Sequence, residues 1–493
     1  MQIKDKTTLR QIKSSALKMR GVSKIALIAF AVMAGPSAVF ISAEPAEAQR
    51  IDPSLYDGGK ARVNRSASLR SLTEEMASAS CRVDAGIGAE SAQAQLASVR
   101  ADFDKIIDGL INGSAALGMP GAERSGRTLT ALTTTAQSWG PLNAAAQNLA
   151  SGAGTDEDAA TIKAGFADLF ELTEQLAAVV AGQYTDPTQL LQSDATVLNF
   201  AVRQRALAYR MTRAMCELAT GSASADAQQE LATSVDQFQQ TLIALRDGFP
   251  AAGINPPPND AVRASLESTF EIWQNQRGIF DAALAGQTPA AEDVAAAAEL
   301  ANRLSVGMNN TITLYLIATP GQDGVYRVPL EAYAREELSN WLTNQDLIAA
   351  IKAQNAQHDG LSEDDILVLD QQWRAEASAG NGPLVDKLLT SPVSSWLLEQ
   401  QDATAGFVTE VFVMDNKGLN VAQSVVTSDY WQGDEAKWQE TYTVGPDALH
   451  ISEVEFDDST GFYQSQGSMS ITDPETGEVI GAVTFGINVQ SLM

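Results

Sequence analysis

Apolar positions recur every three or four residues through most of the chain between residues 60 and 320, which is the spacing of an amphipathic helix. These segments are rich in Ala, Leu, Gln and Glu, which favour helices. Clusters of glycine and proline interrupt them, and each cluster predicts a helix end. The pattern predicts two tandem antiparallel four-helix bundles, at about 60–190 and 191–320. The breaks are Gly86-Ile87-Gly88, Gly118–Gly121 and Ser151–Gly154 in the first bundle, and Gly221, Pro250–Pro258 and Gly286–Pro289 in the second.

The composition changes after residues 319–324. Residues 331–403 still have the pattern of helices, and from residue 407 the pattern becomes that of β-strands. Helices that lead into a short antiparallel sheet predict an α+β domain at 330–493. The predicted fold class is therefore mainly α, with two tandem bundles followed by this α+β domain. Its expected helices cover 336–354, 363–376 and 383–400, and its expected strands cover 407–414, 451–456, 463–471 and 479–489, with another strand beginning at Leu419.

The two predicted bundles are copies of one another. When the chain is shifted by 135 residues, 14 of the 50 positions from Asn64 to Gly113 are identical to those from Asn199 to Gly248, without a gap. A gapless match of this kind is far above chance, so we interpret the bundles as an internal repeat. Both cysteines take part in it, since Cys81 and Cys216 occupy equivalent positions.

The first fifty residues differ from the rest of the chain. A basic start is followed by an apolar run from Ile25 to Phe40 and then by Ala46-Glu47-Ala48, which has the small-residue pattern of a cleavage site. This pattern predicts a signal peptide at 1–48 and a periplasmic or secreted mature protein. The alternative is an uncleaved N-terminal membrane anchor, although the apolar run is shorter than the roughly 20 residues that span a bilayer.

Composition narrows the classes of function. The chain has 33 basic and 61 acidic residues, for a formal net charge of −28, and such a charge repels nucleic acid. Its two histidines, His358 and His450, and its two cysteines provide few ligands for a metal or a haem. The sequence contains no glycine-rich phosphate loop and no nucleophile elbow. We therefore expect no metal, no cofactor, no nucleic-acid partner and no enzymatic activity.

One helix of the second repeat carries a specific motif. It has Asn199, then Arg205 six residues later and Arg210 five residues after that. This arrangement resembles the first periplasmic helix of the NarX/PilJ-type family, which comprises nitrate/nitrite sensor kinases and type IV pilus methyl-accepting transducers. The first repeat keeps the asparagine and the first arginine, Arg70, but has Glu75 at the position of the second arginine.

The resemblance implies a four-helix bundle that dimerises through its first helix and holds a small anion, such as nitrate or nitrite, between two copies. Arg70 and Arg205 would clamp the anion, with Tyr209 and Arg210 beside them, because guanidinium groups present planar donors to a planar oxyanion. The alternative is that these arginines pair with the abundant acids of the chain. Glu75 lowers the positive potential near the clamp, which leaves open whether the site still binds an anion.

The resemblance also bears on the cysteines. Each cysteine follows its arginine by 11 residues, Arg70 to Cys81 and Arg205 to Cys216, so that arginine and cysteine share one helix face. If the two bundles of one chain pack through these faces as a pseudo-dimer, the equivalent cysteines meet near the pseudo-twofold axis. We therefore predict a disulfide between Cys81 and Cys216. The alternative is two buried free cysteines.

In the C-terminal region, segments 411–418, 428–438 and 481–487 resemble extracellular PAS-like (Cache) sensor domains, in which long helices precede a sheet. The second segment interleaves two acids with three aromatic residues, a combination that suits a cationic or amine-bearing ligand. The alternative is that the aromatic residues fill the core while the acids face solvent. The candidate ligand-binding residues are Asp429, Tyr430, Trp431, Asp434 and Trp438.

Together these features predict an exported, soluble sensory protein that binds a small anion or a small organic molecule. No kinase or methyl-accepting segment follows the last expected strand, so the protein would signal through a separate membrane-bound kinase or chemoreceptor. The alternative is a structural or envelope-interaction protein that uses the sensor folds as scaffolds and binds no ligand.

Overall fold

A computed structural model gives the fold and describes residues 57–184, 192–221, 224–318, 324, 326–404, 406–457 and 462–492. The signal peptide predicted at 1–48 lies outside these residues. Within the described ranges, no helix is both long enough and apolar enough to cross a membrane. The chain is mainly helical and has an antiparallel sheet in its C-terminal region, as the sequence predicts.

Four long helices form the first bundle, and they end at the breaks expected from the sequence. Helix α1 packs against α2 and α4, and α3 closes the ring between α2 and α4. Their apolar faces meet in one core, which includes the buried side chains of Leu69, Met76, Phe103 and Trp139. The helices are α1 (Gly59–Asp84), α2 (Ala89–Asn112), α3 (Gly126–Ala150) and α4 (Asp156–Tyr184).

The second bundle repeats this plan. Phe103 and Trp139 of the first bundle are in contact, with ring centroids 4.1 Å apart, and Phe238 and Trp273 make the equivalent contact at 4.7 Å. One connection is more elaborate, because two short turns precede the loop before the last helix. The helices are α5 (Gln192–Thr220), α6 (Ser224–Asp247), α7 (Asp260–Gln276) and α9 (Ala291–Ala318), and the two turns are η4 (Arg277–Phe280) and α8 (Asp281–Leu284).

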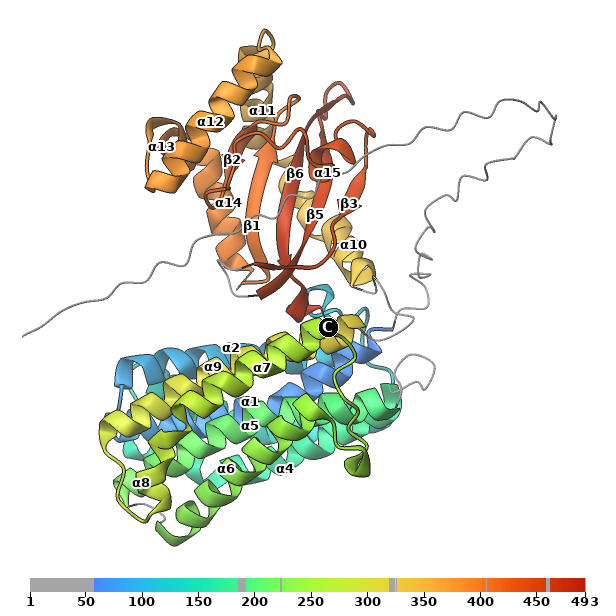
Figure 1. Ribbon diagram of the computed structural model, residues 1–493. Coiled ribbons are helices and arrows are strands. Elements are labelled where there is room, and N and C mark those ends of the chain that lie inside the picture. Colours follow the sequence, from blue (N-terminus) through green and yellow to red (C-terminus); the bar gives the residue numbers. More distant parts are fainter. Residues whose placement is uncertain are drawn as a thin grey trace, which may run out of the picture. The chain divides into compact units, whose positions relative to one another are not determined.

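Helices α1 and α5 pack against each other, and this contact joins the two bundles (Figure 1). We call the facing residues of α1 and α5, with the residues of α2, α4, α6 and α9 that border them, the seam. Cys81 and Cys216 lie on it and form a disulfide with Cα atoms 6.3 Å apart. The predicted pairing of the cysteines is confirmed.

The helices of the C-terminal domain are more broken than the sequence predicts. The single helix expected at 336–354 is wrong, because Asn344 interrupts it and caps the next helix by accepting two backbone N–H bonds. The single helix expected at 383–400 is also wrong, because Pro392 starts a new helix that Ser391 caps. The elements are α10 (Arg327–Glu336), η5 (Leu338–Thr343), α11 (Gln345–His358), α12 (Glu363–Ala379), α13 (Pro383–Leu389) and α14 (Pro392–Ala403).

In the described part of the domain, six strands form one antiparallel sheet in the order β2-β1-β6-β5-β3, with β4 also paired to β5. The strand expected at 451–456 is instead two short strands, because β3 and β4 pair with different parts of the long strand β5. The strands are β1 (Val408–Met414), β2 (Asn420–Gln423), β3 (Leu449–Ile451), β4 (Glu455–Asp457), β5 (Phe462–Thr472) and β6 (Val479–Asn488).

The first strand, β1, is apolar on both faces of the sheet. Val411 and Val413 point to one face and join the large apolar cluster, whereas Phe412 and Met414 point to the other and pack near Trp438. Trp438 belongs to the short helix α15 (Ala436–Gln439). This two-sided burial explains why β1 reads as an almost continuous apolar run.

Candidate functional site

Contacts across the seam occur in pairs that the 135-residue offset relates to each other. On one side of the disulfide, Glu74 of α1 pairs with Arg210 of α5. On the other side, Glu75 of α1 lies near Tyr209 of α5, and each group influences the pKa of the other. Because Glu74 is equivalent to Tyr209 and Glu75 to Arg210, the two contacts are one contact made twice about a pseudo-twofold axis.

The two candidate clamp arginines have equivalent neighbours of different charge. Arg70 is buried, and its Nη1 donates to Glu174 Oε1 of α4 at 3.0 Å. Arg205 is buried as well, but its partner at the equivalent position on α9 is the amide of Asn309. Its Nη2 also donates to Ser68 Oγ at 2.8 Å. Arg70 therefore makes the ion pair that the alternative interpretation expects, whereas no ion pair joins Arg205 to an acid among the described residues.

Arg205 is a buried cation with incomplete compensation. Burial, together with the nearby charge of Arg65, lowers the pKa of Arg205 to about 10, although the charge of Glu75 opposes the shift. The Nε atom of Arg205 has no hydrogen-bond acceptor in the described part of the chain. Burying a charge without a counter-ion is strongly unfavourable. A small anion beside Arg205 would offset this cost, and the charge of the nearby Arg65 would add to its attraction.

Arg210 belongs to a cluster of ion pairs. Its Nε donates to Glu74 Oε1 at 2.8 Å, and the Nε of Arg213 donates to Glu74 Oε2 at 3.1 Å. Arg213 also forms ion pairs with Glu217 of its own helix, α5, and with Glu230 of α6. Burial alone would lower the pKa of Arg213, but Glu74, Glu230 and Glu217 outweigh it and raise that pKa above its ordinary value. Arg210 thus has acidic partners, as the alternative interpretation expects.

The opposite side of the axis carries a polar network with a single acid at its centre. Glu75 is partly buried and accepts a hydrogen bond from Gln95 Nε2 of α2 at 2.7 Å. The neighbouring Tyr209 donates to Asn302 Oδ1 of α9 at 3.2 Å. Desolvation raises the pKa of Glu75 to about 7, even though the hydrogen bond from Gln95 opposes the shift. Tyr209 is buried, and desolvation raises its pKa too.

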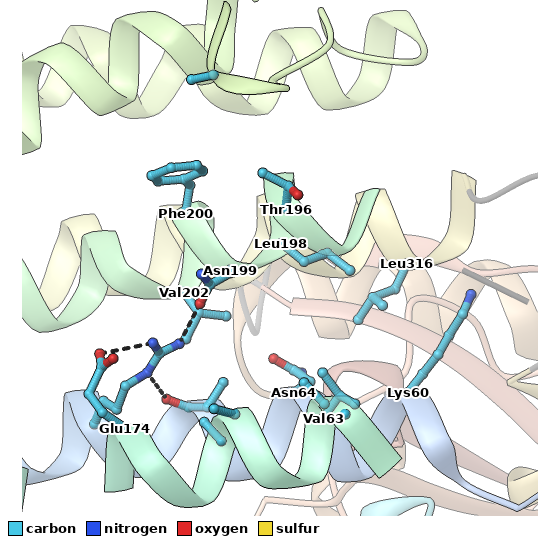
Figure 2. A pocket seen from close by; sticks show the side chains of 17 residues that line it. Lys60, Val63, Asn64, Glu174, Thr196, Leu198, Asn199, Phe200, Val202 and Leu316 are labelled. Atoms are coloured by element: carbon cyan, nitrogen blue, oxygen red, sulfur yellow. Dashed lines mark hydrogen bonds and ion pairs between the residues drawn. The ribbon is translucent and has the colours of Figure 1, made fainter. Parts of the chain in front are cut away.

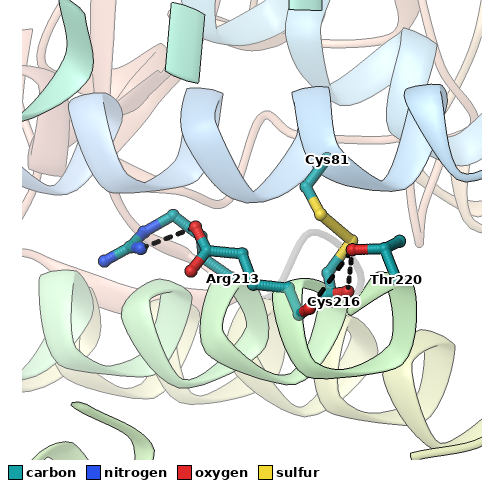
Figure 3. Close-up of a disulfide and its surroundings, with 5 residues drawn as sticks. Cys81, Arg213, Cys216 and Thr220 are labelled. Carbon is teal, nitrogen blue, oxygen red and sulfur yellow. Dashed lines mark hydrogen bonds and ion pairs between the residues drawn. A yellow bond between two sulfur atoms is a disulfide. The ribbon is translucent and has the colours of Figure 1, made fainter. Parts of the chain in front are cut away.

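Three members of the ion-pair cluster, Glu74, Arg213 and Glu230, were not among the candidates from sequence. Two of them had a signal, because Glu74 precedes Cys81 by seven residues and Arg213 precedes Cys216 by three, which puts both on the cysteine face. Figure 3 shows Arg213 on the helix that carries Cys216. Glu230 lies on another helix and had no comparable local signal. Only the packing of α6 against α5 brings it to the cluster.

A cavity of about 770 Å³ lies on one side of the seam, where α1, α4 and α5 meet (Figure 2). The ion pair of Arg70 and Glu174 forms part of its wall, together with Asn199, whose Oδ1 accepts a hydrogen bond from Arg70 at 3.1 Å. Most of the remaining wall is apolar. Arg205, Tyr209 and Arg210 are not among its lining residues.

The aromatic candidates of the C-terminal domain make contacts that stabilise the fold. Tyr430 is buried and stacks on Trp373 of α12, with ring centroids 5.3 Å apart. The indole N–H groups of Trp431 and Trp438 donate to main-chain carbonyls of the turn at 415–418, at 2.9 and 3.1 Å. These contacts agree with the alternative interpretation, in which aromatic residues fill the core. A ligand-binding role for them stays a prediction.

The two acidic candidates, Asp429 and Asp434, have different surroundings. Asp429 accepts hydrogen bonds from Arg374 at 3.2 Å and from Gln432 at 2.7 Å. Asp434 is exposed. Asp429 is therefore engaged by neighbouring side chains, while Asp434 faces solvent, and their binding of an amine also stays a prediction.

Another hollow of the domain, of about 430 Å³, lies between α15 and strands β3, β4 and β5. Three acids that alternate along the chain line it, namely Glu453, Glu455 and Asp457, and Lys437 and His450 line it as well. Burial lowers the pKa of His450. Sequence reasoning missed this group, although acids at every second position of an extended segment share one face and were visible in the sequence.

His358, one of the two histidines of the chain, has a structural partner. Its Nδ1 lies 2.7 Å from Oδ2 of the fully buried Asp415. The other oxygen of Asp415 accepts the backbone N–H groups of Lys417 and Leu419, at 2.8 and 2.9 Å. This buried pair thus stabilises the turn after β1 and connects it to α11.

The described residues define a protein of two disulfide-linked four-helix bundles and an α+β domain. Residues 188–298 match the family described as the type IV pili methyl-accepting chemotaxis transducer N-terminal domain. The match covers α5 to the start of α9 and includes Arg205 and Arg210, but it spans less than a quarter of the chain. The first repeat, with Glu75, lies outside it.

No curated protein matches the chain. Among solved structures, the sensor domain of the histidine kinase DctB from V. cholerae is similar over 32% of this chain and 58% of its own length, at 13% identity and with a TM-score of 0.17. The chain thus spans little more than half of that domain. A likeness of this size carries no argument about fold or function.

Proposed function

We propose that this protein is a sensory component that binds a small anion, such as nitrate or nitrite, in the seam beside Arg205 and signals through a separate membrane-bound kinase or chemoreceptor. The observation that carries the proposal is the burial of Arg205 without an acidic partner among the described residues. The match of its helix to a chemotaxis transducer family supports a sensory role. The proposal assigns the protein no catalytic step and an exported location.

The two repeats explain why a single arginine is proposed. In the first repeat, Arg70 already has an acidic partner, because Glu174 forms an ion pair with it. In the second repeat, Asn309 accepts a hydrogen bond from Arg205 but carries no charge. A planar oxyanion beside Arg205 would accept the N–H groups that Asn309 and Ser68 do not engage.

Nitrate titration with urea unfolding tests this proposal. A nitrate concentration 100 times the dissociation constant raises the free energy of unfolding by about 2.7 kcal/mol, and chloride at equal ionic strength does not reproduce this rise. Asn309→Glu supplies Arg205 with the acid that Arg70 has, and abolishes the effect of nitrate. Glu174→Asn is the matched control, because it makes the reverse exchange in the first repeat and leaves Arg205 unchanged.

Two results would contradict the proposal. One is the absence of stabilisation by nitrate and by nitrite, which would favour the alternative of a structural or envelope-interaction protein that binds no ligand. The other is stabilisation that persists in the Asn309→Glu protein, which would place the anion away from Arg205.

For the C-terminal domain we propose a PAS-like (Cache) sensory role with an amine-bearing ligand. The hollow between α15 and β3–β5 supports this role better than Asp429 and Asp434 do, because the acid Glu455 lines a concave surface there, whereas Arg374 engages Asp429 and Asp434 is exposed. An amine that stabilises the protein less after Glu455→Gln than after the control exchange Asp434→Asn would support it. Equal effects of the two exchanges would contradict it.

A further inference from the structure

The sheet side of the hollow between α15 and β3–β5 carries an acid that a glycine allows to cross a neighbouring strand. Gly486 of β6 is paired with Glu410 of β1 on one side and with Gln466 of β5 on the other. Glu410 reaches past Gly486, and its Oε1 accepts a hydrogen bond from Gln466 Nε2 at 3.0 Å. A Cβ atom at residue 486 would lie 2.5 Å from Glu410 Cγ, so a larger residue there would displace Glu410.

A second contact of the same kind lies beside the first. The register of β1 shifts just before Glu410, and Thr409 and Glu410 thus both reach β5 across the sheet. Thr409 Oγ1 donates to Gln464 Oε1 at 2.7 Å. Both glutamines line the hollow. Because Gln466 uses Nε2 to contact Glu410, its Oε1 is a hydrogen-bond acceptor that receives no donor from the described residues.

The charged groups around the hollow leave one acid without a cation. Lys437 is engaged, since its Nζ lies 3.0 Å from Glu435 Oε2. Glu453 forms an ion pair with Arg327. Glu455 is exposed, and no ion pair joins it to a cation in the part of the chain that the structure describes. A positively charged ligand would therefore find an available counter-charge at Glu455.

Glu410 adds a second negative group beneath this one. It is partly buried and forms no ion pair within the described ranges. Burial raises the pKa of Glu410, although the hydrogen bond from Gln466 and the nearby charge of Lys437 oppose the shift. His450 adds no positive charge near pH 7, because burial lowers its pKa. A cation in the hollow would thus offset part of the cost of burying the Glu410 carboxylate.

The hollow presents hydrogen-bond acceptors and not an aromatic cage. Phe456 is the single Phe, Tyr or Trp among the described residues that line it, and its ring contacts Tyr463 at a centroid distance of 5.1 Å. The ring of Phe412, on the same face of the sheet, already faces Lys437 Nζ at 5.2 Å. Quaternary ammonium groups have no N–H donors and are recognised by several aromatic faces. The lining therefore favours an amine that donates hydrogen bonds.

We propose that the hollow binds a primary ammonium group, with Gln466 Oε1 as the acceptor of an N–H donor and Glu455 as the counter-charge. Glu410 is a positioning residue, because it does not line the hollow and acts by holding the amide of Gln466. Gly486 provides the space that this arrangement requires. The inference rests on the amine-binding role proposed above for this domain and names the class of amine.

Calorimetric titration of the purified full chain with three butyl compounds tests the proposal. Butylammonium and butyltrimethylammonium have the same charge, but only butylammonium has N–H donors, and 1-butanol has no charge. We expect butylammonium to bind at least tenfold more tightly than either of the others, because it alone forms charge-assisted hydrogen bonds. This comparison uses the unmodified chain and does not depend on the folding of a variant.

Substitutions test the role of Glu410. Glu410→Gln keeps the size of the side chain, and should weaken butylammonium binding about tenfold and bring its preference over butyltrimethylammonium towards one. A loss of packing alone would not change this preference. Asp434→Asn is the matched control, since Asp434 is an exposed acid outside the hollow. Because Glu410 acts through Gln466, adding Glu410→Gln to Gln466→Ala should weaken binding no further than Gln466→Ala alone.

Three results would overturn the inference. The first is the absence of saturable butylammonium binding, which would also contradict the amine-binding role of the domain. The second is equal binding of butylammonium and butyltrimethylammonium, and the third is an unchanged preference in the Glu410→Gln protein. If Glu455→Gln still weakens butylammonium binding in the second or third case, the amine-binding role stands and the inference alone fails.

Discussion

The two helical repeats have the same backbone plan, and they differ in the side chains that border the seam. The first has an acid, Glu174, beside its buried arginine and small residues along α4; the second has an amide, Asn309, and large residues along α9. The disulfide lies on the axis that relates them, where both copies contribute the same residue. Two bundles of the same plan can thus share one axis while the two sides of their interface carry different chemistry.

The same contrast appears closer to the disulfide. Glu74 is enclosed by the cations Arg210 and Arg213, whereas the equivalent Tyr209 contacts an acid and an amide. One side of the seam is therefore held by ion pairs and the other by a network with a titratable carboxyl group. This difference can be tested by substitutions that act on the axis, on one side, or on the other.

The largest effect is expected for the disulfide, because it acts on both repeats together. The double exchange Cys81→Ser, Cys216→Ser releases a loop of 135 residues, and we expect the free energy of unfolding to fall by about 3–5 kcal/mol. Urea unfolding of oxidised and serine-containing proteins measures this loss. A loss below about 1 kcal/mol would mean that packing of α1 against α5 suffices without the covalent link.

A smaller loss in the free energy of unfolding is expected when the ion-pair cluster on one side of the seam loses its acid. Glu74→Ala leaves Arg210 and Arg213 without their shared acid, and we expect a loss of about 3 kcal/mol. The matched control is Tyr209→Phe at the equivalent position of the second repeat, which removes one hydroxyl and should cost about 1 kcal/mol. Equal losses in urea unfolding would contradict the difference between the two sides.

The smallest effect is expected for Glu75, and it depends on pH. The pKa of Glu75 is about 7 in the folded protein, against 4.5 ordinarily, so the folded state holds the proton more tightly than the unfolded state. Stability from this group is present below about pH 4.5 and is lost as the pH rises to about 7. Glu75→Gln should therefore stabilise the protein by about 2 kcal/mol at pH 8, a value reduced for partial exposure, and by almost nothing at pH 4.5.

The variant Glu74→Gln serves as the control for this pH dependence. Glu74 is also an acid of α1, but it is enclosed by two arginines, so Glu74→Gln should destabilise the protein at both pH values. Urea unfolding curves at pH 4.5 and pH 8 give the free energy of unfolding of the unmodified protein, of Glu75→Gln and of Glu74→Gln. A Glu75→Gln effect that is the same at both pH values would show that the carboxyl group of Glu75 does not titrate in this range.

Much of the helical fold was predictable because its signals are local. Glycine and proline clusters placed the ends of the long helices, and the offset of 135 residues related Cys81 to Cys216 before any contact was known. The break at Pro392 was also visible in the sequence, and the single helix drawn through it was an error of interpretation. The break at Asn344 was harder to see, because it depends on a side-chain cap to the backbone N–H groups of the following turn.

The candidate site was predictable in part. The motif led to Arg70, Arg205 and Arg210, and all three lie in the seam. Their partners could not be read from the sequence, because Glu174, Asn309 and Glu74 belong to helices whose packing sets the distances. In the C-terminal domain the aromatic candidates make contacts of the core, and the acidic hollow forms only when β4 and α15 come together around β5.

The sequence by itself determined where the long helices of the bundles end, that two helical segments match at an offset of 135 residues, and which two cysteines are equivalent, because each of these depends on residue order alone. Tertiary structure decided which arginine keeps an acidic partner and which side of the axis has a cavity. These outcomes depend on the distances between side chains of different helices. The equivalent positions 174 and 309 carry Glu and Asn, and positions 181 and 316 carry Ala and Leu. The effect of these differences could not be predicted from the sequence, because only packing places the residues beside an arginine or a cavity.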